Sequence, residues 1–173
     1  MKPMAATVAL SEASSGTEFE TFFRSEYARL VRALYLLTGS RSDTEDVAQE
    51  AMARVYERWE RVSTMERPAG YLYRVALHLD RRRRYRLGLQ TRRPRTGPSE
   101  PADPSVVAEA KSDVLRALLA LPPEQRAALV LTGWLGMDGA QAANVLGTKP
   151  STLRARLSRA RTAFRANLGE GYE

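Results

Sequence analysis

The sequence has 173 residues, which suits one domain or two small ones and excludes a large multidomain enzyme. Its net charge of +7, its pI near 10.1 and its 27 basic residues, nearly all arginine, favour a polyanionic partner, because arginine binds phosphate and guanine through paired hydrogen bonds. The absence of cysteine excludes disulfides, cysteine zinc sites and thiol switches, and the single histidine cannot by itself supply a histidine-rich metal site. We therefore expect no metal and no cofactor.

Neither a membrane anchor nor a catalytic motif is visible in the sequence. No run approaches the ~18 apolar residues of a membrane-spanning helix, and the apolar stretch 4–10 is too short for a convincing secretion signal. We find no Gly-rich phosphate loop, no paired catalytic carboxylates and no nucleophile beside a base. The expectation is a cytoplasmic protein that is not an enzyme and does not bind membranes.

The first predicted element follows a small, polar segment, residues 1–16, which we expect to be a disordered tail. Thr17 and Glu20 have the spacing of a capping box, in which two side chains satisfy the free N–H groups at a helix start. Apolar residues then recur at helical spacing until Gly39, where we expect the helix to end.

Two more helices complete the N-terminal half. A second capping-box pattern, Ser42 with Glu45, predicts the start of a helix whose apolar face ends at Trp59. A loop is expected over residues 60–67. Pro68 is favoured in a first helical turn, and the helix that it begins runs directly into a basic cluster of Arg81, Arg82, Arg83, Arg84 and Arg86.

A proline-rich segment separates this half from the rest of the chain. Four prolines, two glycines and no apolar periodicity between Gly88 and Pro104 predict an extended, flexible linker, which we place at residues 88–110. The linker divides the chain into a predicted domain over residues 17–87 and a second over 111–170, so protease cutting is expected between Gly88 and Ser105.

The second predicted domain contains a helix-turn-helix. Asp138 and Gln141 have the capping-box spacing for a short helix that ends at Leu146. Gly147 supplies a tight turn, and Pro150 suits the first turn of the next helix. Two helices joined by such a turn are typical of DNA-binding proteins. Because no strand pattern occurs anywhere, we predict an all-α fold of two small helical domains.

The second helix of this motif, STLRARLSRARTAFR at 151–165, carries five arginines and no acid. Its apolar residues form one narrow stripe, while Ser151, Ala155, Ser158 and Thr162 lie on the opposite face with arginines on both flanks. Short side chains let a helix approach base edges, and flanking arginines reach the phosphates. A basic helix that only adds solubility is the alternative. The helix-turn-helix context favours the DNA-recognition interpretation.

From Phe19 to Leu168 the chain resembles the extracytoplasmic-function (group IV) sigma factors of bacterial RNA polymerase. The resemblance rests on four motifs in family order: SDTEDVAQEAMARVYERW, RPAGYLYRVALHLDRRRR, ALLALPPEQRAALVL and LGTKPSTLRARLSRAR. It implies a protein that binds core RNA polymerase and promoter DNA, opens the DNA and directs promoter-specific initiation. An anti-sigma factor is a further partner that the resemblance alone implies.

The resemblance also implies roles for residues of all three predicted surfaces. Core polymerase would bind Asp43, Asp46, Gln49, Glu50 and Arg54. The downstream promoter element would bind His78, Arg81, Arg82, Arg83 and Arg84, with a flipped base held between His78 and the loop 60–67. The upstream element would bind Ser151, Thr152, Arg154, Arg156, Arg159 and Arg161.

Some positions depart from the family pattern. His78 stands where an asparagine is usual in the base pocket, and the aspartate usually found shortly beyond it is displaced to Asp80. Gln141 and Ala142 replace a glutamate and a bulky aliphatic residue, and Lys149 replaces a capping serine. These departures put recognition of the flipped base in question and predict a recognition-helix cap weaker by ~1 kcal/mol.

Simpler interpretations stay open from the residues themselves. The acidic face at 43–50 is also what a solvated helix face presents, since acids in the first turns favour the helix dipole. A lone histidine is more often an ordinary surface or core residue. Tyr71, Tyr73 and Trp59 are candidate base-stacking platforms, although the helical spacing of Tyr71 and Trp59 favours the core for these two. The two rival functions are a helix-turn-helix repressor that acts without polymerase and a scaffold that regulates by protein contact alone.

Overall fold

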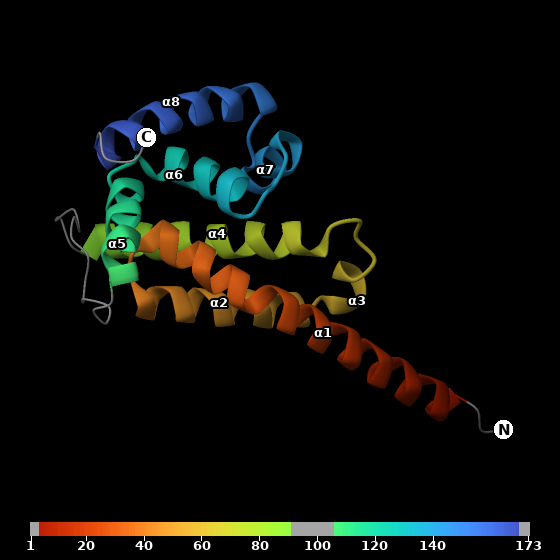
Figure 1. Ribbon diagram of the computed structural model, residues 1–173. Coiled ribbons are helices and arrows are strands. Elements are labelled where there is room, and N and C mark those ends of the chain that lie inside the picture. The colour runs from red at the N-terminus through yellow and green to blue at the C-terminus, as the bar shows by residue number, and fades with distance from the viewer. Residues whose placement is uncertain (1–3, 91–105, 170–173) are drawn as a thin grey trace.

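The computed structural model describes the backbone of residues 4–90 and 106–169 and the side chains of residues 16–88 and 113–169. These residues form helices and no strand, which confirms the predicted all-α fold. The N-terminal half consists of α1 (Met4–Thr38), α2 (Arg41–Tyr56), α3 (Trp59–Val62) and α4 (Pro68–Gln90). The C-terminal half consists of α5 (Val106–Leu119), α6 (Pro123–Leu129), the π-helical turn η1 (Val130–Trp134), α7 (Gly139–Leu146) and α8 (Pro150–Leu168). Figure 1 shows α6, α7 and α8 stacked on one side of α4.

The start of α1 lies earlier in the chain than the predicted start at Thr17. The helix begins at Met4 and includes Thr17 in its interior, so Thr17 and Glu20 do not form its N-terminal cap. Residues 4–16 contain several alanines and no proline, a composition that favours helix. The end of α1 agrees with the prediction, because Gly39 follows it with a φ of 69°, a left-handed conformation that glycine adopts without steric cost. The N-terminal end of α1 projects from the body (Figure 1).

The start of α2 lies earlier than predicted. Ser40, not Ser42, caps the helix: its backbone is extended, and its hydroxyl accepts a hydrogen bond from the N–H of Asp43 at 3.4 Å. Glu45 pairs with Arg41 at 3.4 Å instead of closing a capping box. The reason is the position of Gly39, since the left-handed turn there allows the next helix to begin after a single extended residue.

The predicted linker 88–110 falls largely outside the described residues. At its two described ends the chain is helical, because α4 continues through Gly88 to Gln90 and α5 begins at Val106. Neither of these short end segments contains a proline. Local sequence therefore allows each flanking helix to extend into the segment that composition predicted as linker.

The helix-turn-helix is confirmed. The N–H of Gln141 donates to Oδ1 of Asp138 at 2.8 Å, and the N–H of Asp138 donates to Oε1 of Gln141 at 3.0 Å, which completes the capping box of α7. Gly147 ends α7 with a φ of 62°. Pro150 is in the first turn of α8, and the Lys149 side chain makes no capping hydrogen bond there, as predicted from the missing serine.

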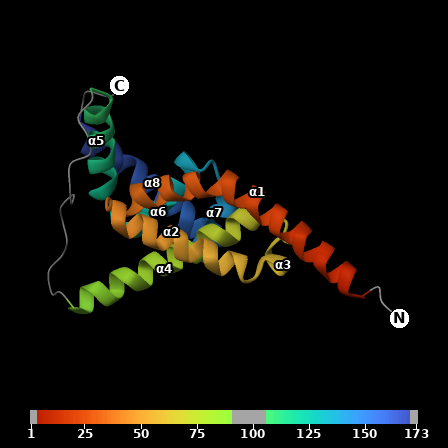
Figure 2. The same cartoon turned by 90° about the horizontal axis from the view of Figure 1, so that it is seen from below.

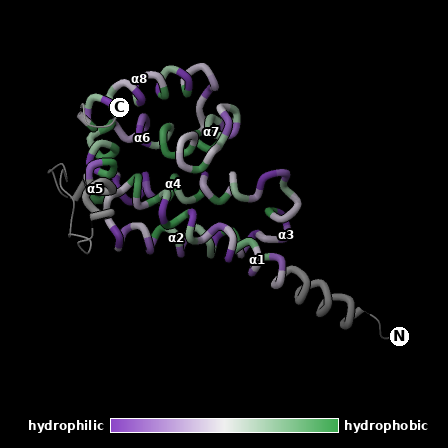
Figure 3. The backbone as a smooth tube through the Cα atoms, viewed as in Figure 1, coloured by the Kyte–Doolittle hydropathy of each residue, from purple (hydrophilic) through white to green (hydrophobic). Residues whose placement is uncertain are grey.

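The two halves share one hydrophobic core. Leu37 of α1, Leu118 of α5 and Leu131 of η1 belong to the same cluster of buried side chains, and α7 packs on α4. α6 and η1 also contact α1. In Figure 2, which looks along the direction of stacking, α6, α7 and α8 overlap α1 and α2 in projection, and Figure 3 shows hydrophobic and hydrophilic residues alternating along the helices of the body. Within the described ranges, no helix is both long and apolar enough to cross a membrane.

Candidate nucleic-acid interface

Helix α8 presents the face that its sequence pattern predicted. Leu153 and Ala160 are fully buried against the body, and Ser151 and Ser158, on the opposite face, are exposed. The burial follows from the apolar stripe, because covering Leu153 removes its side chain from water. The small residues of α8 therefore form an open outer surface.

The arginines of α8 flank this surface. Arg156 and Thr152 are half-buried, and the remaining members of the predicted upstream site are exposed. Arg159 donates a hydrogen bond from Nε to the carbonyl oxygen of Ala155 at 3.3 Å. None of the five arginines forms an ion pair with another described residue. Their charge is thus available to an anionic partner.

The arginine run of α4 divides into two pairs. Arg81 and Arg82 are exposed and form no ion pair within the described part of the chain, whereas Arg83 and Arg84 pair with carboxylates of the same protein. At 100° per residue, four consecutive helical residues are spread over about 300° around the helix axis, so they cannot share one face. Arg81 and Arg82 are therefore the members of this run whose charge has no carboxylate partner among the described residues.

Arg84 pairs with a buried carboxylate. It donates a hydrogen bond to Oδ2 of Asp80, which is only 2% exposed. Burial raises the pKa of Asp80, and the nearby Arg84 and Arg126 oppose that rise. Arg126, from α6, is also partly buried, and its Nη2 donates to the carbonyl oxygens of Leu119 and Leu121 at 2.8 and 3.0 Å. Arg84 therefore belongs to the contact between the two halves.

Arg83 lies against α2. Its Nη2 is 2.8 Å from Oδ1 of Asp43, and its Nη1 is 2.9 Å from Oδ2 of Asp46. The planar guanidinium spans two carboxylates that are three residues apart and therefore on the same side of a helix. Two residues predicted to bind polymerase are thus joined directly to one predicted to bind DNA.

The rest of the acidic face of α2 is open. The side chains of Asp46 and Glu50 are 62% and 51% exposed, and Arg54 pairs with Glu50 at 2.6 Å. Gln49 is also exposed. With a helical repeat of 100° per residue, its side chain is displaced around the helix axis from the side that carries Asp46 and Glu50. The five residues predicted for polymerase binding therefore lie on one helix, with Gln49 on its adjoining face.

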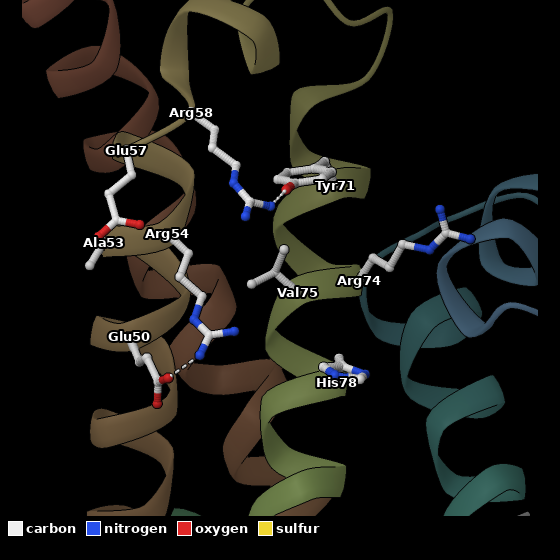
Figure 4. A pocket seen from close by; sticks show the side chains of 9 residues that line it. All are labelled: Glu50, Ala53, Arg54, Glu57, Arg58, Tyr71, Arg74, Val75 and His78. Carbon is white, nitrogen blue, oxygen red and sulfur yellow. Dashed lines mark hydrogen bonds and ion pairs between the residues drawn. The ribbon is translucent and has the colours of Figure 1, made fainter.

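His78 lines a groove between α2 and α4 of about 720 Å³. The loop 60–67, which we expected to share a pocket with His78, contributes no residue to this groove, and its first residues belong to the short helix α3. Nη1 of Arg67, in this loop, instead lies 3.9 Å from Oδ2 of Asp138 in the C-terminal half. In Figure 4, Arg54 from α2 and Arg58 from the turn that follows α2 extend into the space between α2 and α4. The groove is lined by Glu50, Ala53, Arg54, Glu57, Arg58, Tyr71, Arg74, Val75 and His78.

The aromatic residues near the groove differ in their exposure. Trp59 is 7% exposed, as expected of a core residue, and Tyr73 is 4% exposed, with its hydroxyl donating to Glu26 at 3.3 Å. Tyr71 is half-buried and accepts a hydrogen bond from Arg58 at 3.1 Å. Tyr85, which our sequence interpretation did not include, is 70% exposed on α4. The sequence feature that could have identified Tyr85 is its position, because an aromatic residue between two arginines can stack on a base while its neighbours contact phosphate.

The chain matches two family models, Sigma-70 region 2 over residues 22–87 and Sigma-70 region 4 over residues 111–164. It is 30% identical to the RNA polymerase sigma-E factor of Streptomyces coelicolor, over 87% of this chain and 86% of that protein. It is 31% identical to the ECF RNA polymerase sigma factor SigM of Mycobacterium tuberculosis, over 87% and 77% of the two chains.

Solved structures show the same fold. The sigma factor RpoE of Bartonella quintana, in complex with the anti-sigma factor NepR, superposes with a TM-score of 0.77 at 20% identity and covers 89% of this chain and 98% of its own. The extracytoplasmic function sigma factor SigJ of Mycobacterium tuberculosis has a TM-score of 0.54 at 30% identity, over 83% and 52% of the two chains. This chain belongs to the extracytoplasmic-function sigma factors, which bind core RNA polymerase and direct transcription initiation at specific promoters.

Proposed function

We propose that this sigma factor divides its contacts among three helices. The face of α2 binds core polymerase, the outer side of α4 binds the downstream promoter element, and α8 enters the major groove of the upstream element. One observation carries this assignment. α4 and α8 present arginines without an ionic partner among the described residues, whereas α2 presents the exposed carboxylates of Asp46 and Glu50. Phosphate and a cationic protein surface thus have separate places to bind.

For the downstream element, we propose binding of single-stranded DNA along α4. At 100° per residue, His78, Arg82 and Tyr85 lie on one side of the helix, and all three are exposed. A base stacks on Tyr85, the neighbouring guanidinium contacts phosphate, and His78 lines the groove into which a flipped base enters. Arg81 extends the same cationic side, while Arg83 and Arg84 contribute only after leaving their carboxylate partners.

The α4 assignment is tested by replacing Tyr85. Tyr85→Ala is expected to weaken binding of a fluorescent single-stranded oligonucleotide by ~1–3 kcal/mol, because one stacked base is lost, whereas Tyr85→Phe retains the ring and the affinity. Tyr56→Ala is the matched control, since Tyr56 is also exposed, at 60%, but lies on α2. Equal affinities of Tyr85→Ala and the parent chain would contradict stacking at this position.

The polymerase assignment is tested by reversing one charge. Asp46→Arg is expected to weaken core polymerase binding and to abolish run-off transcription from a cognate promoter, while affinity for isolated DNA stays the same or rises. Glu45→Arg makes the same charge change one residue away and is the matched control. Undiminished polymerase binding by Asp46→Arg would contradict the assignment. DNA binding without any polymerase contact would instead support the repressor alternative, for which the acidic face has no use.

We also propose that an anti-sigma factor holds the chain inactive and that the protein acts in the cytoplasm by binding, without catalysis. The support is the likeness to RpoE, whose structure was solved with an anti-sigma factor. Cross-linking of the full chain in its own cells, followed by mass spectrometry, identifies such a partner. The purified partner is expected to suppress run-off transcription when added at equal concentration, and a partner without that effect would contradict the proposal.

A further inference from the structure

Arg83 stands between two of the proposed binding surfaces. Its side chain is 34% exposed and reaches Asp43 and Asp46 with two separate nitrogens, at 2.8 and 2.9 Å. Asp46 remains 62% exposed while it is bound in this way. The bridge is therefore formed at the surface, where an incoming protein or nucleic acid can compete for either side of it.

The neighbours of Arg83 show what this bridge does to the DNA surface. Arg82 has no ionic partner in the described ranges and is free to contact phosphate. Arg83 follows it directly, yet its charge is compensated by two carboxylates. Phosphate binding through Arg83 requires the loss of that compensation. In the free chain, α4 therefore presents fewer available cations than its sequence contains.

The other half of the bridge belongs to the polymerase surface. A cationic polymerase group that contacts Asp43 and Asp46 replaces Arg83 as their charge partner. Conversely, a phosphate that contacts Arg83 leaves both carboxylates unpaired. Coupling between two binding sites acts equally in both directions, so each partner raises the affinity of the other. We propose that the bridge from Arg83 to Asp43 and Asp46 is a switch that couples polymerase binding to DNA binding in this chain.

This inference rests on the proposed function, because it needs both surfaces. The exposure of the bridge limits the size of the coupling. A partly exposed ion pair changes binding affinity by at most about fivefold, so we expect DNA affinity to change by about threefold. Release of Arg83 adds one phosphate contact. For single-stranded DNA, one more contact steepens the dependence of log affinity on log salt by about 0.7.

The experiment uses the full chain and a fluorescent single-stranded DNA oligonucleotide titrated at several salt concentrations. The double variant Asp43→Asn with Asp46→Asn frees Arg83 without reversing any charge. It is expected to bind DNA about threefold more tightly than the parent and with the steeper salt dependence. Addition of Arg83→Ala to the double variant is expected to remove the gain. Arg83→Lys, which keeps the charge, is expected to retain part of it.

Glu45→Gln separates release of Arg83 from a general charge effect. Glu45 is an exposed acid on α2 that pairs with Arg41 and not with Arg83, so its neutralisation is expected to change affinity equally with and without Arg83. Thermal unfolding of each variant establishes that it is folded. Core polymerase provides the reciprocal measurement: Arg83→Ala is expected to bind it more tightly than the parent in the absence of DNA, since the carboxylates are free.

Two outcomes overturn the inference in different ways. If neutralising Asp43 and Asp46 gives the same gain with and without Arg83, the coupling is wrong and the proposed surfaces stand. If Arg82→Ala leaves DNA affinity and its salt dependence unchanged, the proposed DNA surface on α4 is itself wrong, and the coupling fails with it.

Discussion

The guanidinium of Arg126 donates a hydrogen bond from Nη1 to the carbonyl oxygen of Leu37, 2.5 Å away and 89 residues earlier in the chain. Leu37 is in the last turn of α1, where helix carbonyls lack intrahelical partners. Arg126 also binds two carbonyls at the end of α5, so one cation of α6 satisfies acceptors in both halves of the protein. The side chain thereby holds the C-terminal half against the end of α1.

Arg126→Ala is expected to destabilise the chain and to loosen the contact between its halves. Loss of buried hydrogen bonds to three carbonyls corresponds to about 2 kcal/mol, or a melting temperature lower by roughly 4–8 °C at this chain length. Calorimetry measures the first effect, and a larger radius of gyration in small-angle X-ray scattering measures the second. Arg116→Ala, a change at an exposed arginine of α5, is the control. Unchanged melting temperature and radius of gyration would show that Arg126 does not hold the halves together.

Gly39→Ala is expected to destabilise the protein more than Gly147→Ala. Both glycines have positive φ, at 69° and 62°, and an alanine there is strained by ~1 kcal/mol. A Cβ at Gly39 would also lie 2.6 Å from Cδ1 of Leu119, whereas at Gly147 no atom lies within 4 Å. Denaturant unfolding of the two variants measures the difference. Leu119→Ala in the Gly39→Ala background is expected to relieve the clash, and equal destabilisation at both glycines would contradict close packing at Gly39.

Asp80→Asn is expected to raise the melting temperature at neutral pH. Burial raises the pKa of Asp80 above its ordinary value of 3.8, so the folded chain binds the proton more tightly than the unfolded chain. The stabilisation from that proton is complete below the ordinary pKa and is lost as pH rises through the folded value. Asparagine is neutral at every pH and avoids this loss.

Unfolding from pH 4 to pH 8 measures this effect. The gap between Asp80→Asn and the parent is expected to narrow as pH falls, because the parent then becomes protonated at Asp80. Glu45→Gln, at an exposed acid, is expected to show no such narrowing. A parent chain that is more stable than Asp80→Asn at neutral pH would mean that Arg84 and Arg126 compensate the carboxylate better than its pKa indicates.

Alanine substitutions of the α8 arginines are expected to weaken promoter binding in two different ways. Arg154→Ala or Arg156→Ala, early in the helix, is expected to weaken promoter binding by about 1–3 kcal/mol and to relax preference at particular upstream bases. Arg165→Ala, near the end of the helix, is expected to weaken binding to all sequences alike and to lower the salt slope by about one. Binding of the full chain to a series of promoter variants at several salt concentrations measures both. If every arginine substitution lowered affinity equally for all sequences, α8 would bind DNA only as a cationic surface, which would contradict base recognition by this helix.

Features that depend on neighbouring residues could be predicted from the sequence. Gly39 ends α1, Asp138 and Gln141 cap α7, and the apolar stripe of α8 is buried on the predicted side. These features depend on backbone conformation, local hydrogen bonds and helical periodicity, all of which act within a few residues. The same periodicity indicated which face of α8 meets solvent, so the candidate recognition surface was available from the sequence.

Which arginines lack a carboxylate partner depends on packing and could not be predicted from the sequence. Arg82 and Arg83 are adjacent and identical in type, yet one is unpaired among the described residues and the other joins two carboxylates of α2. Likewise, nothing local links Arg126 to Leu37. A charge is available or compensated according to the groups within a few ångströms of it, and packing brings those groups together from distant parts of the chain.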